Sequence, residues 1–227
     1  MSDRYGRTWV YESIVGAIPG LSLPDRLAVA VQFVLFETLV LAAAAVYGYW
    51  NAVVPGTLAV AVAAAGSAFM LDMGRRVRGL SLPDSYTRLL FGSSVEVVLG
   101  VVSFVLLVTY LFVVDPRDGA TLLRRLFGPN PAAPAVALTL LVLWDVCYRI
   151  GTGWWAAVLA AYRELAYSFD GDTAAELRAL DSRNVGFAFL QLAVVPLLAD
   201  QPLLAFAVAG HVLAVGIVVA VARLSSA

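Results

Sequence analysis

The sequence predicts an all-α polytopic membrane protein with about six transmembrane helices, arranged as three hairpins in a single domain over residues 1–227. Composition is the first observation behind this prediction. Of the 227 residues, 61% are hydrophobic and 14% are charged, whereas a soluble domain has about 45–50% apolar and about 25% charged residues. A soluble fold of this size has too little interior to hide that excess. The solvent that accepts such a chain is therefore a lipid bilayer.

Six apolar stretches are the second observation. A helix that crosses a hydrocarbon layer of ~30 Å needs about 20 mostly apolar residues. The stretches are 27–49, 52–73, 89–114, 133–162, 185–199 and 203–222. The fourth is long enough to project beyond the bilayer, and the fifth is short and contains Pro196. None of them alternates as a barrel strand does, so all six predict helices.

The distribution of arginine predicts the orientation in the cell membrane, because cytoplasmic loops carry an excess of basic residues. With the N-terminus inside, eleven arginines lie on the cytoplasmic side and three lie outside. The cytoplasmic set is Arg4, Arg7, Arg26, Arg75, Arg76, Arg78, Arg88, Arg163, Arg178, Arg183 and Arg223, and the outer set is Arg117, Arg124 and Arg125. This bias predicts a multi-pass protein with both termini in the cytoplasm.

The polar segments are predicted to lie on the cytoplasmic side. Residues 1–25 would form a cytoplasmic or interfacial segment, in which 8–18 would make a short helix on the membrane surface. Residues 163–184 would form a cytoplasmic loop. Within that loop, Thr173 and Glu176 have the spacing of a capping box and predict the start of a short helix.

An internal repeat is the most specific pattern in the sequence. The hexapeptide Gly-Leu-Ser-Leu-Pro-Asp occurs at residues 20–25 and again at 79–84, an offset of 59 that also relates Glu37 to Glu96. Both copies precede an apolar stretch on the same predicted side, so the first two hairpins form a parallel repeat. The repeat units are residues 20–78 and 79–162, followed by a C-terminal hairpin at 185–222.

Each hexapeptide has the pattern of a helix start. The N-caps would be Ser22 and Ser81, the first turns would contain Pro24 and Pro83, and the third positions would be Asp25 and Asp84. Helix initiation therefore explains the hexapeptide without a ligand.

Ionisable residues inside the predicted spans are the candidate functional residues, because such groups are costly at membrane depth. They are Glu37, Glu96, Asp145, Arg149 and His211. Glu96 shares a helix face with Gly92 and Gly100, which predicts close packing against another helix. The alanine-rich second span offers a matching surface. Asp145 and Arg149 are four residues apart, which favours an intrahelical ion pair.

Two interpretations of these residues stay open. In the structural one, Arg149 is neutralised by Asp145 and one glutamate, and the cluster only holds the helices together. In the functional one, three acids outnumber the basic groups, so at least one carboxyl binds a proton or lies beside a cation. His211 stands among small apolar residues and predicts a helix–helix hydrogen bond rather than a metal ligand.

Composition also excludes several classes of protein. A single cysteine, Cys147, permits neither an intramolecular disulfide nor a cysteine zinc site. The absence of lysine excludes a P-loop lysine and a Schiff-base lysine. A net charge of −1 gives no electrostatic basis for binding nucleic acid. Motifs of serine hydrolases, zinc proteases and dinucleotide-binding folds are missing too, so we expect no cofactor and no metal.

Three function classes remain. The first is a small proton- or cation-handling transporter or channel, in which Glu37 and Glu96 line a site at mid-membrane and Asp145 with Arg149 forms a gate or counter-ion. The second is a non-catalytic membrane scaffold or partner-binding module. The third is a lipid-acting membrane enzyme that uses the carboxyls and His211. The expected partners are the lipid bilayer and, through small-residue faces, a second copy of the chain.

Overall fold

The computed structural model describes residues 8–18, 20, 23–118 and 121–224, and every regular element in these ranges is a helix. Five helical segments are long and apolar enough to cross a membrane. They are Asp25–Tyr47, Trp50–Arg78, Asp84–Arg117, Ala133–Ala166 and Pro202–Leu224. The chain is therefore an all-α protein of membrane-protein character, with five candidate spans where the sequence predicted about six.

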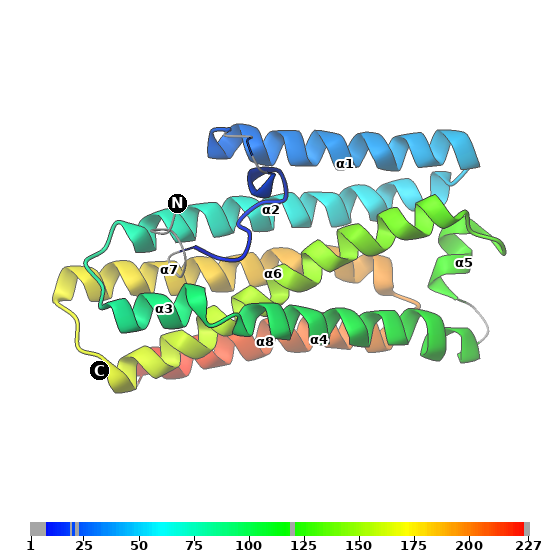
Figure 1. Cartoon of the computed structure of the whole chain (residues 1–227). Helices are drawn as coiled ribbons and strands as arrows, with labels where there is room; N and C mark the ends of the chain where they lie inside the picture. Colours follow the sequence, from blue (N-terminus) through cyan, green and yellow to red (C-terminus); the bar gives the residue numbers. More distant parts are fainter. Residues whose placement is uncertain (1–7, 19, 21–22, 119–120, 225–227) are drawn as a thin grey trace.

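The helices lie side by side in an elongated bundle (Figure 1). In chain order they are α1 (Asp25–Tyr47), α2 (Val53–Arg78), α3 (Asp84–Gly92), α4 (Val95–Thr109), α5 (Leu122–Phe127), α6 (Ala133–Ala166), α7 (Gly171–Leu190) and α8 (Pro202–Leu224). A π-helical turn (Tyr110–Val114) continues α4, and a 3-10 helix, η5 (Gln191–Leu198), continues α7. The C-terminal ends of α2, α6 and α8 meet at one end of the bundle, which we call the arginine-rich end.

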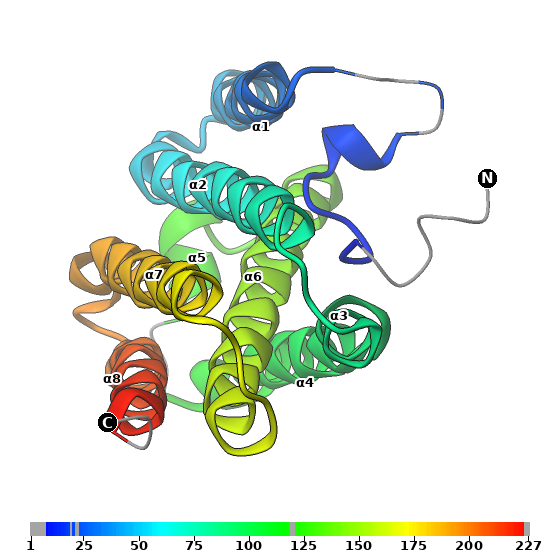
Figure 2. The same cartoon turned by 90° about the vertical axis from the view of Figure 1, so that its left-hand side faces the viewer.

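Helix α6 runs diagonally through the centre of the bundle and packs against α1, α2, α3, α4, α7 and α8 (Figure 2). Its 34 residues extend about 50 Å at a rise of about 1.5 Å per residue, which exceeds the hydrocarbon thickness, as its length predicted. The closest crossing is with α4. A Cβ atom on Gly151 would lie 2.5 Å from the backbone nitrogen of Gly100 and 2.6 Å from the carbonyl oxygen of Glu96.

This crossing corrects the predicted partner of the Glu96 face. Gly92 ends α3 before the break at Ser94, so it does not share a helix face with Glu96. The Gly100 face of α4 does pack closely against another helix, but that helix is α6 rather than the alanine-rich α2. The small residue that meets Gly100 is Gly151.

Helices α1, α4 and α8 present wide apolar faces outward. Large side chains such as Val34, Leu106 and Phe206 stay exposed, with Phe206 at 75%. Helix α1 is peripheral and packs mainly on α2 (Figures 1 and 2). Apolar faces of this extent are not stable in water in a monomer, and they fit helices in contact with lipid.

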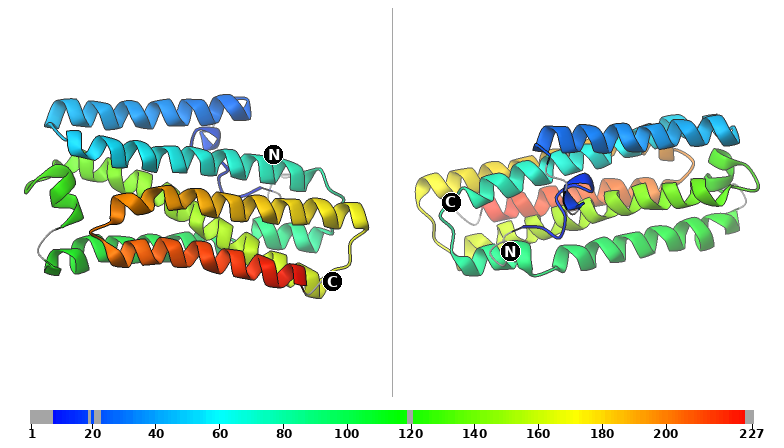
Figure 3. Two further views of the ribbon diagram at one scale, coloured as in Figure 1. Left: turned by 180° about the vertical axis from the view of Figure 1, so that it is seen from behind. Right: turned by 45° about the horizontal axis from the view of Figure 1, so that its top comes forward.

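The segment predicted as a cytoplasmic loop, residues 163–184, is mostly helical. Helix α6 continues through Ala166, and α7 begins at Gly171 and runs beside α8 (Figure 3). The N-cap of α7 is Asp170, whose carboxylate accepts from the backbone N–H of Thr173 at 2.9 Å, so Thr173 is not the cap. The predicted fifth span, 185–199, is split between the end of α7 and η5.

The short helix predicted to start near Thr173 is present, but charge explains why the full length of α7 was not predicted. Its charged side chains form ion pairs with α2 and α6, namely Arg183–Asp72, Glu176–Arg76 and Asp181–Arg163. The Asp181–Arg163 pair is buried, and the other two pairs lie at the bundle surface, so charged residues occur along a helix that packs in the bundle. Among the described residues, α7 with η5 is the one long segment not apolar enough to count as a candidate span.

The two hexapeptides precede α1 and α3, but serine caps neither helix. The N-cap positions are Pro24 and Pro83, and each helix begins at the following aspartate; Ser22 lies outside the described residues. The helices that follow also differ. Helix α1 runs unbroken to Tyr47, whereas the second copy breaks between α3 and α4, where Ser94 has a φ of +58°.

Residues 8–18 do not form the predicted surface helix. We call this segment the N-terminal strap. It lies along the side of the bundle between α1 and α3 and contains only one turn of 3-10 helix, Val15–Ala17 (Figures 2 and 3). Its aromatic side chains instead find ring partners in the bundle: Trp9 packs edge-on against Phe91 at 4.9 Å between ring centroids, and Tyr11 stacks on Tyr148 at 4.2 Å.

Candidate functional site

Asp145 and Arg149 form the centre of a buried polar network. The two residues lie one turn apart on α6, and Nη2 of Arg149 donates to Oδ1 of Asp145 at 2.8 Å. Each side chain is only 1% exposed. Their spacing predicted this pair, and the fold encloses it completely.

Arg149 binds groups from three directions. Nη2 also donates to the hydroxyl of Ser67 on α2 at 2.8 Å, and Nη1 donates to the backbone carbonyl of Glu12 in the N-terminal strap at 3.0 Å. The guanidinium lies 5.2 Å from the ring centroid of Tyr11 and 5.8 Å from that of Tyr148. Such contacts stabilise a cation that has left water.

Gly66 makes room for this arginine. A Cβ atom there would lie 2.8 Å from Cγ of Arg149. Because the clash would involve the part of the side chain closest to its own backbone, Arg149 could not move away without leaving its partners. Position 66 is therefore part of the site, although its sequence gave no sign of it.

Asp145 receives two further donors. The hydroxyl of Tyr11 donates to Oδ1 at 3.2 Å, and Nε2 of Gln32 on α1 lies 3.4 Å from Oδ2. The carbonyl oxygen of Gln32 in turn accepts from Ser67 at 2.8 Å. Gln32 therefore links α1 to both α2 and α6.

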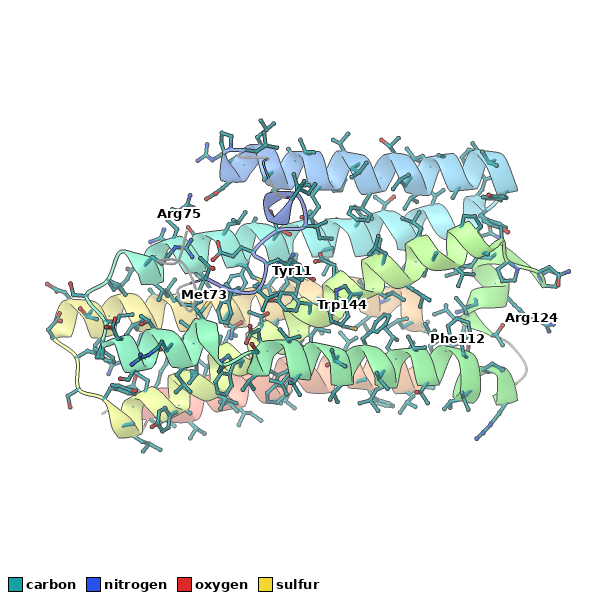
Figure 4. The ribbon with its side chains drawn as sticks, in the orientation of Figure 1. Tyr11, Met73, Arg75, Phe112, Arg124 and Trp144 are labelled. Carbon is teal, nitrogen blue, oxygen red and sulfur yellow. The ribbon has the colours of Figure 1, made fainter. Side chains whose placement is uncertain are left out.

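The α6 polar network, as we define it, consists of Asp145, Arg149, Ser67, Gln32 and Tyr11. It joins α1, α2, α6 and the strap, and Tyr11 lies between α2 and the crossing of α4 with α6 (Figure 4). Burial, and next the charge of Asp145, raise the pKa of Tyr11 above its ordinary value. Its hydroxyl therefore keeps its proton at neutral pH and remains a donor to Asp145.

A small cavity adjoins the network, with space for about one water molecule. Its lining is Ile14, Gln32, Phe36, Val60, Ala63, Val142 and Asp145. Gln32 and Asp145 are its polar lining residues, and the strap contributes Ile14. Because the cavity is so small, the described arrangement contains no wide aqueous passage at this point.

Glu96 is buried in a different way. The residue is 0% exposed, and neither carboxylate oxygen has a hydrogen-bond partner in the described part of the chain. It lies in the first turn of α4, directly after the break at Ser94. The hydroxyl of Tyr148 is also buried without a partner there, and the Cα atom of Tyr148 lies 3.1 Å from the Cβ position of Gly100, one turn along α4 from Glu96.

Glu37 and His211 lie apart from this region. Oε1 of Glu37 accepts from the hydroxyl of Thr57 at 2.8 Å, which places Glu37 in the contact of α1 with α2. His211, on α8, lies 5.9 Å from Trp154 between ring centroids, and its Nδ1 atom has no partner among the residues described. Of the five predicted residues, the fold joins only Asp145 and Arg149 by a hydrogen bond.

No group of three histidine, cysteine, aspartate or glutamate side chains that could hold a metal ion occurs within residues 8–18, 20, 23–118 and 121–224. In the same ranges, no hydrogen bond or ion pair joins His211 to a carboxyl. The pairing of His211 with a carboxyl that a lipid-acting enzyme would need is thus not formed.

Two further polar clusters escaped the sequence analysis. At the arginine-rich end, the buried Arg163 binds Asp181 at 2.6 Å and Glu164 at 3.0 Å. At the opposite end, Nε2 of Gln201 donates to Asp115 at 3.0 Å. These residues lie outside or at the edges of the predicted spans, where polar residues are ordinary, so hydropathy could not single them out.

Comparison with known proteins gives one match. The model of a family of unknown function (DUF7530) matches residues 4–222, nearly the whole chain. No curated protein and no solved structure matches it.

Proposed function

Since the chain belongs to this family of unknown function, we propose a function from the site itself: a proton-handling membrane protein in which Glu96 binds and releases the proton. The observation that carries the proposal is a carboxyl with 0% exposure and no hydrogen-bond partner on either oxygen among the described residues. The α6 polar network supplies a fixed, internally neutralised neighbour to that carboxyl.

The two buried acids on α4 and α6 have opposite environments. Asp145 has Arg149 at 2.8 Å and donors from Tyr11 and Gln32, so its negative charge is compensated. An ionised carboxylate at Glu96 would have no such compensation, and burying an isolated charge costs so much that the group takes up a proton instead. We therefore identify Glu96 as the carboxyl that binds a proton, which the excess of acids over basic groups in the sequence led us to expect.

The helix break at Ser94 supports a group that changes protonation. Discontinuous helices in transporters place the end of a half-helix at the transported ion, and Glu96 lies in the first turn of α4. The positive end of the helix dipole stabilises an anion at this position. Once water reaches it, the deprotonated carboxylate is therefore tolerated as well.

Glu37 is the second acid of the proposal. It occupies the repeat-related position, and its Oε2 atom is buried without a partner in the described residues, while Oε1 is bound by Thr57. We assign it a secondary role on the α1–α2 side. The parallel repeat itself, the arginine-rich end in the cytoplasm and homo-oligomers in the membrane all belong to the same proposal, supported by the hexapeptides, the arginine bias and the exposed apolar faces.

A scaffold function is the second candidate, and one observation favours it. The charges of Asp145 and Arg149 are fully matched within the chain, as in a pair that only holds helices together. In that case Glu96→Gln would change stability and leave ion movement unaffected.

Proton flux into proteoliposomes, followed with an internal pH dye under an imposed gradient, separates the two candidates. We expect flux with the wild-type chain and a loss of at least about ten-fold in Glu96→Gln, because the amide cannot carry the proton. The matched control is Asp172→Asn, which removes an exposed carboxylate from the start of α7 and should leave flux unchanged. Absence of flux with the wild-type chain would overturn the transport proposal.

A further inference from the structure

We infer that the N-terminal strap, residues 8–18, is a displaceable lid, and that the small cavity beneath it, lined by the strap, α1, α2 and α6, is the entrance through which water reaches the buried acids. This inference rests on the proposed function for the role of the entrance. The existence of the lid can be tested separately.

The strap completes the α6 polar network from outside the bundle helices. Tyr11 donates to Asp145 at 3.2 Å, the carbonyl of Glu12 accepts from Arg149 at 3.0 Å, and Ile14 forms one wall of the small cavity. Displacing the strap would remove one partner from each member of the buried ion pair. Water is the natural replacement for both partners.

The same displacement would uncover the route to Glu96. The ring of Tyr11 stacks on Tyr148 with 4.2 Å between centroids and an angle of 18°, so Tyr11 covers one face of that ring. The hydroxyl of Tyr148 has no partner in the described structure, and the backbone of Tyr148 packs against Gly100, one turn along α4 from Glu96. Removal of Tyr11 would therefore uncover a ring at the crossing of α4 with α6, the crossing at which Glu96 lies.

The strap is fitted imperfectly, as expected of a segment that leaves its place. Trp9 is 2% exposed, yet its indole N–H has no hydrogen-bond partner among the described residues. An unsatisfied buried donor is unfavourable relative to the same group in water. Apart from one 3-10 turn the strap has no helical hydrogen bonds of its own to break.

One ion pair at the rim holds the strap closed. Glu12 is the only charged residue in the strap, and its carboxylate accepts from Arg78 at the end of α2, at 2.5 and 3.2 Å. The side chains are 12% and 34% exposed. Gly74 leaves the space for this pair, because a Cβ atom there would collide with the carboxylate of Glu12. We call Glu12–Arg78 the latch.

The test measures how fast a cysteine in the cavity wall reacts with a small thiol reagent. In a Cys147→Ala background, the reporter is Ala63→Cys, because Ala63 lines the cavity and is buried. The full-length chain is labelled in liposomes with a methanethiosulfonate reagent, with and without Glu12→Gln. We expect labelling about five-fold faster with Glu12→Gln, the change that corresponds to a rim pair worth about 1 kcal/mol.

The matched control is Asp25→Asn, which breaks a different rim pair, Asp25–Arg75 at 2.7 Å, on α1 and α2. It should leave the labelling rate unchanged. Equal acceleration by Asp25→Asn would show general loosening and overturn the lid, as would an unchanged rate with Glu12→Gln.

If Glu12→Gln fails to fold, salt replaces the mutation. At about 1 M salt the Debye length falls to about 3 Å, so the latch weakens and the reporter in the otherwise native chain should react faster. No change with salt would then contradict the lid. Flux distinguishes the lid from the proton function. Faster labelling of a chain that shows no proton flux would support the lid and contradict the proton function. If proton flux is the same with and without Glu12→Gln, the strap does not cover the entrance, and the assignment of the proton to Glu96 still stands.

Discussion

Arg149 shows how a single charged side chain is made tolerable inside this bundle. Its charge is matched by Asp145, two of its nitrogens bind Ser67 and the carbonyl of Glu12, and two tyrosine rings cover it. Glu96, by comparison, has none of these compensations in the described structure. The neighbours of Arg149 thus compensate its charge, whereas Glu96 lacks such neighbours and is expected to bind a proton.

Arg149→Met should destabilise the protein by about 3–5 kcal/mol, because it leaves Asp145 as an uncompensated buried charge. The double variant Asp145→Leu with Arg149→Met should recover much of that loss, since it removes both charges. Unfolding in detergent micelles measures both values. Arg75→Met is the control, because its pair with Asp25 is exposed and is worth about 0–1 kcal/mol. Additive effects of the Asp145 and Arg149 substitutions would contradict the coupled pair.

At the scale of the elements, the crossing of α4 with α6 decides where Glu96 lies. The two backbones approach so closely that the carbonyl of Glu96 faces Gly151. The break at Ser94 then sets the direction in which α4 leaves α3. The position and burial of the Glu96 carboxyl therefore depend on the contact of Gly151 with α4 and on the helix break at Ser94.

Gly151→Ala should destabilise the protein by about 1–3 kcal/mol, the usual cost of overpacking, because the new Cβ would meet backbone atoms at 2.5 and 2.6 Å. Backbone atoms cannot rotate away as a side chain can. Gly186→Ala on α7 is the matched control: nothing lies within 4 Å of its Cβ position, so it should stabilise the helix by about 0.5–1 kcal/mol. Thermal unfolding of both variants is the measurement, and equal effects would contradict the close crossing.

Sequence reasoning succeeded for elements whose pattern is local. The apolar runs predicted α1, α2, α6 and α8, and the four-residue spacing predicted the Asp145–Arg149 pair. It failed where distant partners decide. The helix predicted near Thr173 runs on without a break to Leu190, and its charged side chains pair with residues of α2 and α6. Residues 8–18 enter the bundle because Phe91 and Tyr148 offer ring partners, and neither contact is visible along the chain.

At the scale of the whole molecule, the fold separates ionisable residues that the sequence analysis grouped together. Five midmembrane ionisable residues suggested one shared site, yet the fold distributes them over three places: the α6 polar network with Glu96 nearby, the α1–α2 contact and α8. The bundle combines lipid-facing helices, a protonatable acid at a helix break and a strap across the only entrance proposed here.

Infrared spectroscopy of the full-length protein in lipid tests the protonation of Glu96 most directly. A protonated carboxyl has a carbonyl stretching band separate from that of a carboxylate, and an isolated buried acid keeps this band at neutral pH. We predict such a band in the wild-type chain, its loss in Glu96→Gln, and its persistence in Asp172→Asn. A spectrum at neutral pH without a protonated carboxyl band, or one whose band survives Glu96→Gln unchanged, would contradict the assignment of the proton to Glu96.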